Sequence, residues 1–197
     1  MDFGEVIRRR RMIRQYLDTP VPTESLDRIV DAALRAPSAG FAQGQSLIVI
    51  TDRDQRERIA QAANEQDYVD RGYPRWLSVA PVHVVVTVSE EAYLDRYRES
   101  DKLGPDLDTL DWDVPYWWVD GGATMMAILL AVVNEGLAAG FQGSHNFDDL
   151  SAVLGAPDTV MPLGVITIGF GAADDQSRGS ARRGHRLQAD TVHYDSW

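Results

Sequence analysis

The stretch Gly121-Gly122-Ala123-Thr124-Met125-Met126-Ala127-Ile128-Leu129-Leu130-Ala131-Val132-Val133 decides the fold class. It carries no charged side chain and is bounded by Asp120 and by Asn134-Glu135. Because it is apolar on nearly all sides, it predicts a helix over 121–139 that is buried in a core or at a subunit interface. The uninterrupted apolar part is shorter than the roughly 20 residues that span a bilayer. We therefore expect a central helix of a globular protein.

The elements around this helix do not alternate regularly. Apolar spacing and capping residues predict helices over 3–10, 23–34, 52–64 and 90–98, and from 144 or 146 to 154. Clusters of β-branched residues predict strands over 47–51, 82–88 and 163–170. The acidic residues 99–115 are predicted to form a long loop. This order indicates an α+β layer structure in one domain over 1–197, not repeated βαβ units.

Composition excludes several function classes. The 197 residues carry a net charge of −11, from 19 basic and 30 acidic side chains, which argues against nucleic-acid and anionic-membrane partners. Cysteine is absent, so disulfide scaffolds and thiol nucleophiles are excluded. The four histidines show no metal-ligand spacing, and no glycine-rich dinucleotide or phosphate loop is present. The first residues have no apolar signal-peptide core, so we expect a cytoplasmic protein.

Arginine is concentrated near both ends of the chain. Lys102 is the only lysine, and half of the arginines lie in two terminal segments: Arg8, Arg9, Arg10, Arg11 and Arg14, then Arg178, Arg182, Arg183 and Arg186. One interpretation is a solvated surface with local ion pairs. The other is a phosphate clamp, since the planar guanidinium binds phosphate oxygens in a bidentate manner.

The segment Arg10-Arg11-Met12-Ile13-Arg14-Gln15-Tyr16, followed by Pro20-Val21-Pro22, resembles the Arg-Arg-Ser-x-Arg-x-Phe/Tyr pattern of the nitroreductase family. The resemblance implies a three-layer α+β fold with a small, mainly antiparallel sheet, in an intertwined homodimer around the central helix. It also implies that Arg10, Arg11, Met12 and Arg14 bind the phosphate, ribityl chain and pyrimidine edge of FMN. Met12 replaces the usual serine, so a hydroxyl contact is lost.

A second segment, Ala36-Pro37-Ser38-Ala39-Gly40-Phe41-Ala42-Gln43-Gly44, resembles the family's Ala-Pro-Ser-x-x-Asn-x-Gln-Pro-Trp loop. Its form is similar to that of an actinobacterial-type branch. The resemblance implies that this loop reaches the flavin across the dimer interface through Pro37, Ser38, Ala39, Phe41 and Gln43. Phe41 replaces the asparagine and Gly44-Gln45 replaces Pro-Trp, which leaves the choice of flavin open. Alternatively, the segment is an ordinary turn that ends a helix.

Two further segments extend the resemblance. Glu135 to Gly143 is similar to the family's glycine-containing segment near the flavin ring, which implicates Gln142 and Gly143; a helix C-cap at Gly140 is the alternative. Arg182-Arg183-Gly184-His185-Arg186-Leu187 resembles the C-terminal stretch that closes the phosphate site, which implicates Arg183 and Arg186. Taken alone, this tail would be interpreted as disordered.

The aromatic residues before the central helix have two interpretations. Trp112 and Tyr116, with Phe41, could line a substrate pocket over the flavin and stack a planar compound. Alternatively, they pack in the core and at an interface. The sequence does not decide whether 99–118 is a lid or a dimer contact.

The resemblance implies that the chain is an enzyme in which FMN, not a protein side chain, carries the chemistry. Hydride would pass from NAD(P)H through flavin N5 to a small planar acceptor, such as a nitroaromatic compound or a quinone, in a ping-pong scheme. Arg14 would stabilise negative charge on the reduced flavin. A deazaflavin-using or flavin-remodelling enzyme and a non-catalytic flavin-storage protein are the alternatives. The physiological substrate and the choice between NADH and NADPH stay open.

Overall fold

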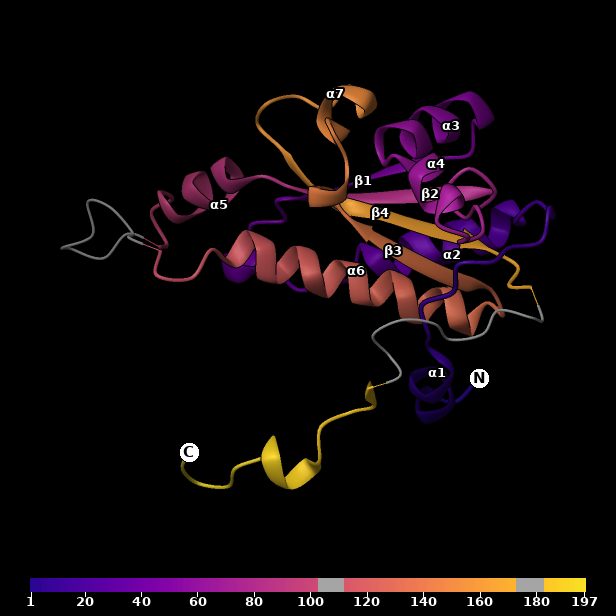
Figure 1. Cartoon of the computed structure of the whole chain (residues 1–197). Helices are drawn as coiled ribbons and strands as arrows, with labels where there is room; N and C mark the ends of the chain where they lie inside the picture. The colour runs from indigo at the N-terminus through magenta and orange to yellow at the C-terminus, as the bar shows by residue number, and fades with distance from the viewer. Residues whose placement is uncertain (103–111, 173–182) are drawn as a thin grey trace.

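The computed structural model describes residues 1–102, 112–172 and 183–197 (Figure 1). Arg178, Arg182 and most of the predicted 99–115 loop lie outside these ranges. Within them, the strands form one antiparallel sheet in the order β1-β2-β4-β3. The strands are β1 (Gln45–Ile50), β2 (Val82–Val88), β3 (Ala138–Gly143) and β4 (Met161–Gly169).

Helices cover both faces of this sheet, which gives three layers (Figure 1). The helices are α1 (Phe3–Arg9), α2 (Thr23–Ala33), α3 (Arg53–Ala62), α4 (Glu65–Asp70), α5 (Glu90–Tyr97), α6 (Tyr116–Asn134) and α7 (Leu150–Leu154). Side chains of α2 and α6 pack on one face against Val84, Val86 and Ile166. Side chains of α3 and α7 pack on the other face with Val85 and Val165. Both faces of the central strands are covered, which explains why β2 is buried along its whole length.

Side-chain caps fix the start of several helices. The carboxylates of Asp2 and Asp52 accept hydrogen bonds from the first turns of α1 and α3, which confirms the helix starts predicted there. The predicted cap at Ser144 or Asn146 is wrong, because 144–146 is a short 3-10 turn. Asp149 instead accepts from the backbone of Ala152 and begins α7.

The central helix and the strand after it differ from the prediction of one helix over 121–139. α6 begins at Tyr116 and ends at Asn134, because Gly136 adopts φ 74° and turns the chain into β3. The alternative of a helix C-cap at Gly140 is therefore wrong, since Gly140 pairs with Thr167 inside the sheet. β3 is a fourth strand that the sequence did not predict. α4 was not predicted either.

α6 is long and apolar enough to cross a membrane by length and composition alone. It is nevertheless a core helix of this fold. Its residues Ile128, Leu129 and Val132 are buried against α2 and the sheet. The other side is less covered, since Val119 and Met126 are 52% and 45% exposed. α6 therefore has one face in the core and one apolar face that the single chain leaves uncovered.

Candidate functional site

The arginine-rich segment after α1 lies along the end of the sheet. Met12 forms a parallel bridge with Ala139, and the Ile13 N–H donates to the Ala139 carbonyl over 2.8 Å. Further along, Tyr16 forms an antiparallel bridge with Gly171. The Tyr16 hydroxyl lies 2.7 Å from Thr167 Oγ1, inside the fold. These contacts hold the backbone of residues 12–16 next to β3 and β4.

The glycine at position 140 permits this close approach. A Cβ atom there would lie 2.4 Å from the Ile13 carbonyl oxygen and 2.8 Å from Cζ3 of Trp76. Neither distance is compatible with a side chain, and the first contact is with rigid backbone. Gly140 is therefore needed for packing between two segments, and it does not act as a helix cap.

The arginines of this segment differ in their partners. Arg9 pairs with Glu5 over 2.6 Å, as the surface interpretation expected. Arg14 lies over the indole of Trp76, with 5.0 Å between its guanidinium carbon and the ring centroid. In the described part of the chain, Arg8, Arg10 and Arg11 form no ion pair. Arg8 and Arg11 line an open cavity of about 560 Å³ beside the C-terminal end of α6. This cluster presents positive charge that an anion could neutralise.

The loop over 36–44 is held in a strained conformation at the other end of α6. Gly40, Phe41 and Gln43 have φ values of 60°, 57° and 52°, in the left-handed region that few non-glycine residues adopt. Side chains that persist in this region usually belong to functional loops that the surrounding fold holds in place. Phe41 is 72% exposed, so the strain does not serve to bury it.

A buried carboxylate holds this loop. Asp120, in the first turns of α6, accepts hydrogen bonds from the backbone N–H of Ala39 over 2.8 Å and from the Tyr93 hydroxyl over 2.7 Å. Burial and the Asp120 carboxylate together raise the pKa of Tyr93, so the hydroxyl stays protonated and remains a donor. Arg96 adds a donor from α5 to the Gly40 carbonyl, over 2.8 Å. The loop is thus positioned by two helices.

One chain does not bring the two predicted flavin segments together. The loop over 36–44 is held at Asp120, near the start of α6, whereas the arginine cluster lies near Gly136, after the end of α6. At 1.5 Å per residue these points are about 24 Å apart along the helix. Figure 1 shows α5 near the first end and α1 near the second. A site that uses both segments needs a second chain.

Comparison with known proteins agrees with this fold. Residues 7–170 match the model of the nitroreductase family. The chain belongs to the nitroreductase family. It is 28% identical, over all of its length and 88% of the relative's, to a "Putative NADH dehydrogenase/NAD(P)H nitroreductase" of Methanothermobacter thermautotrophicus. It is 27% identical to an "FMN reductase [NAD(P)H]" of Bacillus subtilis, covering 82% of this chain and 63% of the relative.

The fold is also shared with solved structures. An FMN-dependent nitroreductase from Clostridium difficile superposes with a TM-score of 0.72 at 21% identity, over 98% of each chain. The solved structure confirms the prediction of a nitroreductase-like α+β fold, and the family match with the named relatives confirms the prediction of a nitroreductase-type enzyme. The actinobacterial-type branch stays a prediction.

The predicted cofactor-binding residues of the second half of the chain lie in two places. Gln142 and Gly143 are half-buried at the end of β3, where Gly143 pairs with Gly164. Arg183 and Arg186 lie on an exposed tail. The Arg186 guanidinium donates there to the backbone carbonyl of Asp190, so its contact is local. Contact of Arg183 and Arg186 with the arginine cluster stays a prediction.

The aromatic residues before α6 were predicted either to line a substrate pocket or to pack in the core, and the structure agrees with each interpretation in part. Trp112 is half-buried and lies edge-on to Tyr97 and Tyr116, with centroids 4.7 Å and 5.6 Å away. This is the packing arrangement. Tyr116 is 42% exposed, so its ring is also accessible from the surface. Trp112 packs against the same buried cluster as Ala39, so the aromatic residues and the loop over 36–44 lie at the same end of α6.

Two residues that hold the candidate segments were not predicted. In the sequence, Asp120 marks only the boundary of the apolar stretch, although a carboxylate at the start of a buried helix indicates a buried partner. Trp76 lies in a segment without periodicity, so no spacing pattern indicates it.

Proposed function

We propose that this protein is an FMN-dependent NAD(P)H oxidoreductase that works as a homodimer. The observation that carries the proposal is the arginine segment docked against β3 at Gly140. It holds Arg10, Arg11 and Arg14 on a segment whose backbone is fixed at the edge of the sheet, because Gly140 carries no side chain and leaves room for the Ile13 carbonyl. The FMN and NAD(P)H named for the relatives support the same cofactor pair.

The charge of the cluster fits the FMN phosphate. Arg8, Arg10 and Arg11 have no acidic partner in the described ranges, so their positive charge is not already neutralised there. A dianionic phosphate accepts bidentate, charge-assisted hydrogen bonds from guanidinium groups. The net charge of −11 disfavours long polyanions but does not oppose a single phosphate at this local cluster. We propose that Arg183 and Arg186 complete the phosphate site from the tail.

The separation of the two segments supports the homodimer. If the uncovered face of α6, with Val119 and Met126, packs against a second chain, apolar area leaves water. The loop with Ser38, Phe41 and Gln43 would then reach the arginine cluster of the partner. This also gives the strained, exposed Phe41 a reason to be held outward.

The flavin, when bound, supplies hydride transfer from NAD(P)H to a second substrate. The chain's own residues bind and orient it. Arg14, which lies over the Trp76 indole, would place positive charge near the part of the flavin that becomes negative on reduction, and this charge would favour the reduced form. We propose that Phe41 and Tyr116 form an aromatic wall for a small planar acceptor, which would take the place of the nicotinamide in a ping-pong scheme.

The test is the visible spectrum of the purified protein, followed by anaerobic addition of NADH or NADPH. We expect a yellow protein whose flavin, released by denaturation, is FMN and whose absorbance bleaches on addition of the nicotinamide. A bound flavin that fails to bleach would identify a storage protein instead. A chain that binds deazaflavin but not FMN would also contradict the proposal.

A further inference from the structure

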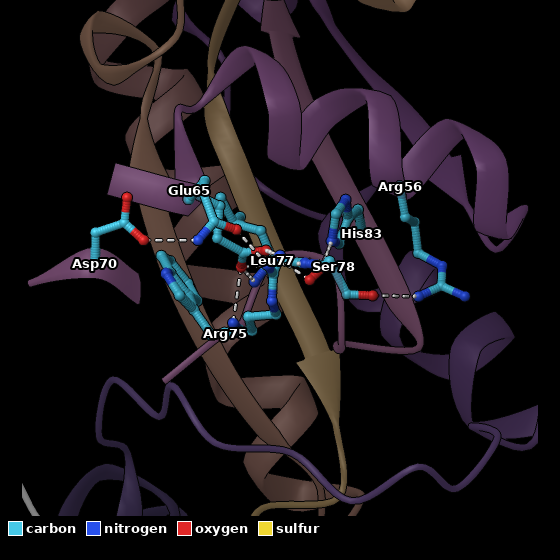
Figure 2. A network of polar contacts seen from close by, with 9 residues as sticks. Arg56, Glu65, Asp70, Arg75, Leu77, Ser78 and His83 are labelled. Atoms are coloured by element: carbon cyan, nitrogen blue, oxygen red, sulfur yellow. Dashed lines mark hydrogen bonds and ion pairs between the residues drawn. The ribbon is translucent and has the colours of Figure 1, made fainter. Parts of the chain in front are cut away.

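The segment over 76–80, between α4 and β2, is held by a buried carboxylate (Figure 2). It forms no helix or strand, so its backbone N–H groups have no regular partners. Glu65, only 3% exposed, accepts at Oε1 from the N–H groups of Trp76, Leu77 and Ser78, over 2.8, 2.7 and 3.3 Å. Its Oε2 accepts from the Ser78 hydroxyl over 2.5 Å. One side chain thus fixes three consecutive residues.

The carbonyls of the same segment are held as well (Figure 2). Nε2 of His83 donates to the Leu77 carbonyl over 2.8 Å, and Arg56 donates to the Ala80 carbonyl over 2.6 Å. Burial lowers the pKa of His83 to about 4, so the ring is neutral and keeps a single N–H for this bond. Trp76 therefore cannot shift without breaking hydrogen bonds inside the protein, which is costly.

Trp76 in turn lies between two parts of the candidate site. Its indole is 6% exposed and carries the Arg14 guanidinium on its face, at 5.0 Å. Its edge touches the backbone at Gly140, where an added Cβ would come within 2.8 Å. A guanidinium is attracted to the face of an aromatic ring, so a displaced indole would no longer favour the same position of the Arg14 side chain.

We propose that Glu65 is a positioning residue for the flavin site, which holds Trp76 and through it orients Arg14. This rests on the proposed function for the role of Arg14 toward FMN. Glu65 itself does not reach the site. Its carboxylate is fully used by the backbone of 76–78, by Ser78 and by Arg75, whose Nη1 lies 3.7 Å away.

The first test uses the protein without FMN. The Nε–H signal of Arg14 and the indole N–H signal of Trp76 are recorded by ¹⁵N NMR in the wild type, Glu65→Gln and Glu65→Ala. We expect both signals to shift or broaden in Glu65→Ala and to stay closer to the wild type in Glu65→Gln, which keeps an acceptor oxygen. If the Arg14 signal is the same in all three, Glu65 does not position Arg14, whatever the protein binds.

The second test measures the Kd for FMN by titration of apoprotein. We expect Glu65→Ala to weaken binding about tenfold, and the same change in an Arg14→Met background to cost less than about twofold, since coupled residues are not additive. Trp76→Leu, which leaves Glu65 in place, should match Glu65→Ala and serves if the latter fails to fold. Glu57→Ala is the matched control, because Glu57 lies on the neighbouring helix and pairs with Arg53 at the surface.

Two outcomes overturn the inference. One is an unchanged Kd in Glu65→Ala despite a lower Tm, which would make Glu65 structural only. The other is an equal loss with and without Arg14, which would mean that Glu65 acts by another route. Failure of the wild type to bind FMN overturns the proposed function instead, and the NMR comparison still decides on the positioning of Arg14.

Discussion

Substitution of Gly140 by alanine tests whether the arginine segment is docked on β3 as described. The added Cβ would lie 2.4 Å from the Ile13 carbonyl oxygen, 2.8 Å from Cζ3 of Trp76 and 2.9 Å from Oγ1 of Thr167. A backbone oxygen cannot rotate away from a clash as a long side chain can. The segment over 12–16 must therefore move away from β3, and its hydrogen bond from Ile13 to Ala139 must lengthen or break.

The size of the movement follows from these distances. Ordinary contacts of a Cβ begin at 3.4 Å, so the segment must retreat by about 1 Å. Overpacking of this kind destabilises a fold by about 1–3 kcal/mol. A displacement of about 1 Å of a group that binds a reactant can cost about 100-fold. We therefore expect Gly140→Ala to weaken FMN binding by about 10- to 100-fold while the protein still folds.

The assay combines FMN titration of apoprotein with urea unfolding. Gly4→Ala, on α1, is the control, because its added Cβ would meet only flexible side chains, at 3.3 Å or more. We expect the control to bind FMN as the wild type does. If Gly140→Ala binds FMN as tightly as the control and unfolds at the same urea concentration, the close docking of the segment on β3 is refuted.

Three other substitutions test separate parts of the account. Burial lowers the pKa of His83 from 6.5 to about 4, so the free energy of unfolding is highest above pH 6.5 and decreases by up to about 3 kcal/mol as the pH falls toward 4. Urea unfolding should show this pH dependence in the wild type and not in His83→Gln. Asp120→Ala leaves the Ala39 N–H and the Tyr93 hydroxyl without their charged acceptor, so the free energy of unfolding should fall by about 1.5–3 kcal/mol and FMN should dissociate faster. If neither value changes, Asp120 does not hold the loop over 36–44. Met126→Glu puts a charge on the uncovered face of α6 and disfavours burial of this face in a dimer, so light scattering should detect folded monomers. If the variant is still a dimer, this face is not the interface.

The main helices and strands could be predicted because their signals lie within short stretches of the sequence. The run over 82–88 is apolar at every position except His83 and Thr87, and the structure buries all of it between two helical layers. Asp2 and Asp52 mark helix starts because a side-chain cap depends only on neighbours a few residues away.

The end of α6 and the strand after it could not be predicted in this way. Ala138 to Gly143 lacks β-branched residues, and it forms a strand because β4, distant in the sequence, offers its edge. The alanines before Gly140 continue a helical pattern in the sequence. The helix ends at Gly136, which adopts a left-handed conformation, but the sequence does not show which of the nearby glycines ends the helix. Tertiary pairing, not local propensity, decides this segment.

In the candidate site, too, local sequence patterns indicate some residues, and tertiary contacts decide the others. The sequence pattern indicates Arg10, Arg11 and Arg14 as candidates, and the structure places their segment against β3, while their role toward a flavin stays a prediction. The residues that pack against the arginine segment could not be identified from the sequence. Glu65 reaches the backbone of residues 76–78 only through the fold, so its role is not visible in a run of polar residues around it.

The central claim is that the arginine cluster binds the phosphate of FMN, and comparison of FMN with riboflavin tests it most directly, since riboflavin differs in lacking the phosphate. Two charge-assisted hydrogen bonds, each worth about 1.5–3 kcal/mol, predict that apoprotein binds FMN about 100-fold or more tightly than riboflavin. Arg10→Ala should remove most of that preference and leave riboflavin binding unchanged. Equal affinity of the wild type for the two flavins would contradict the account.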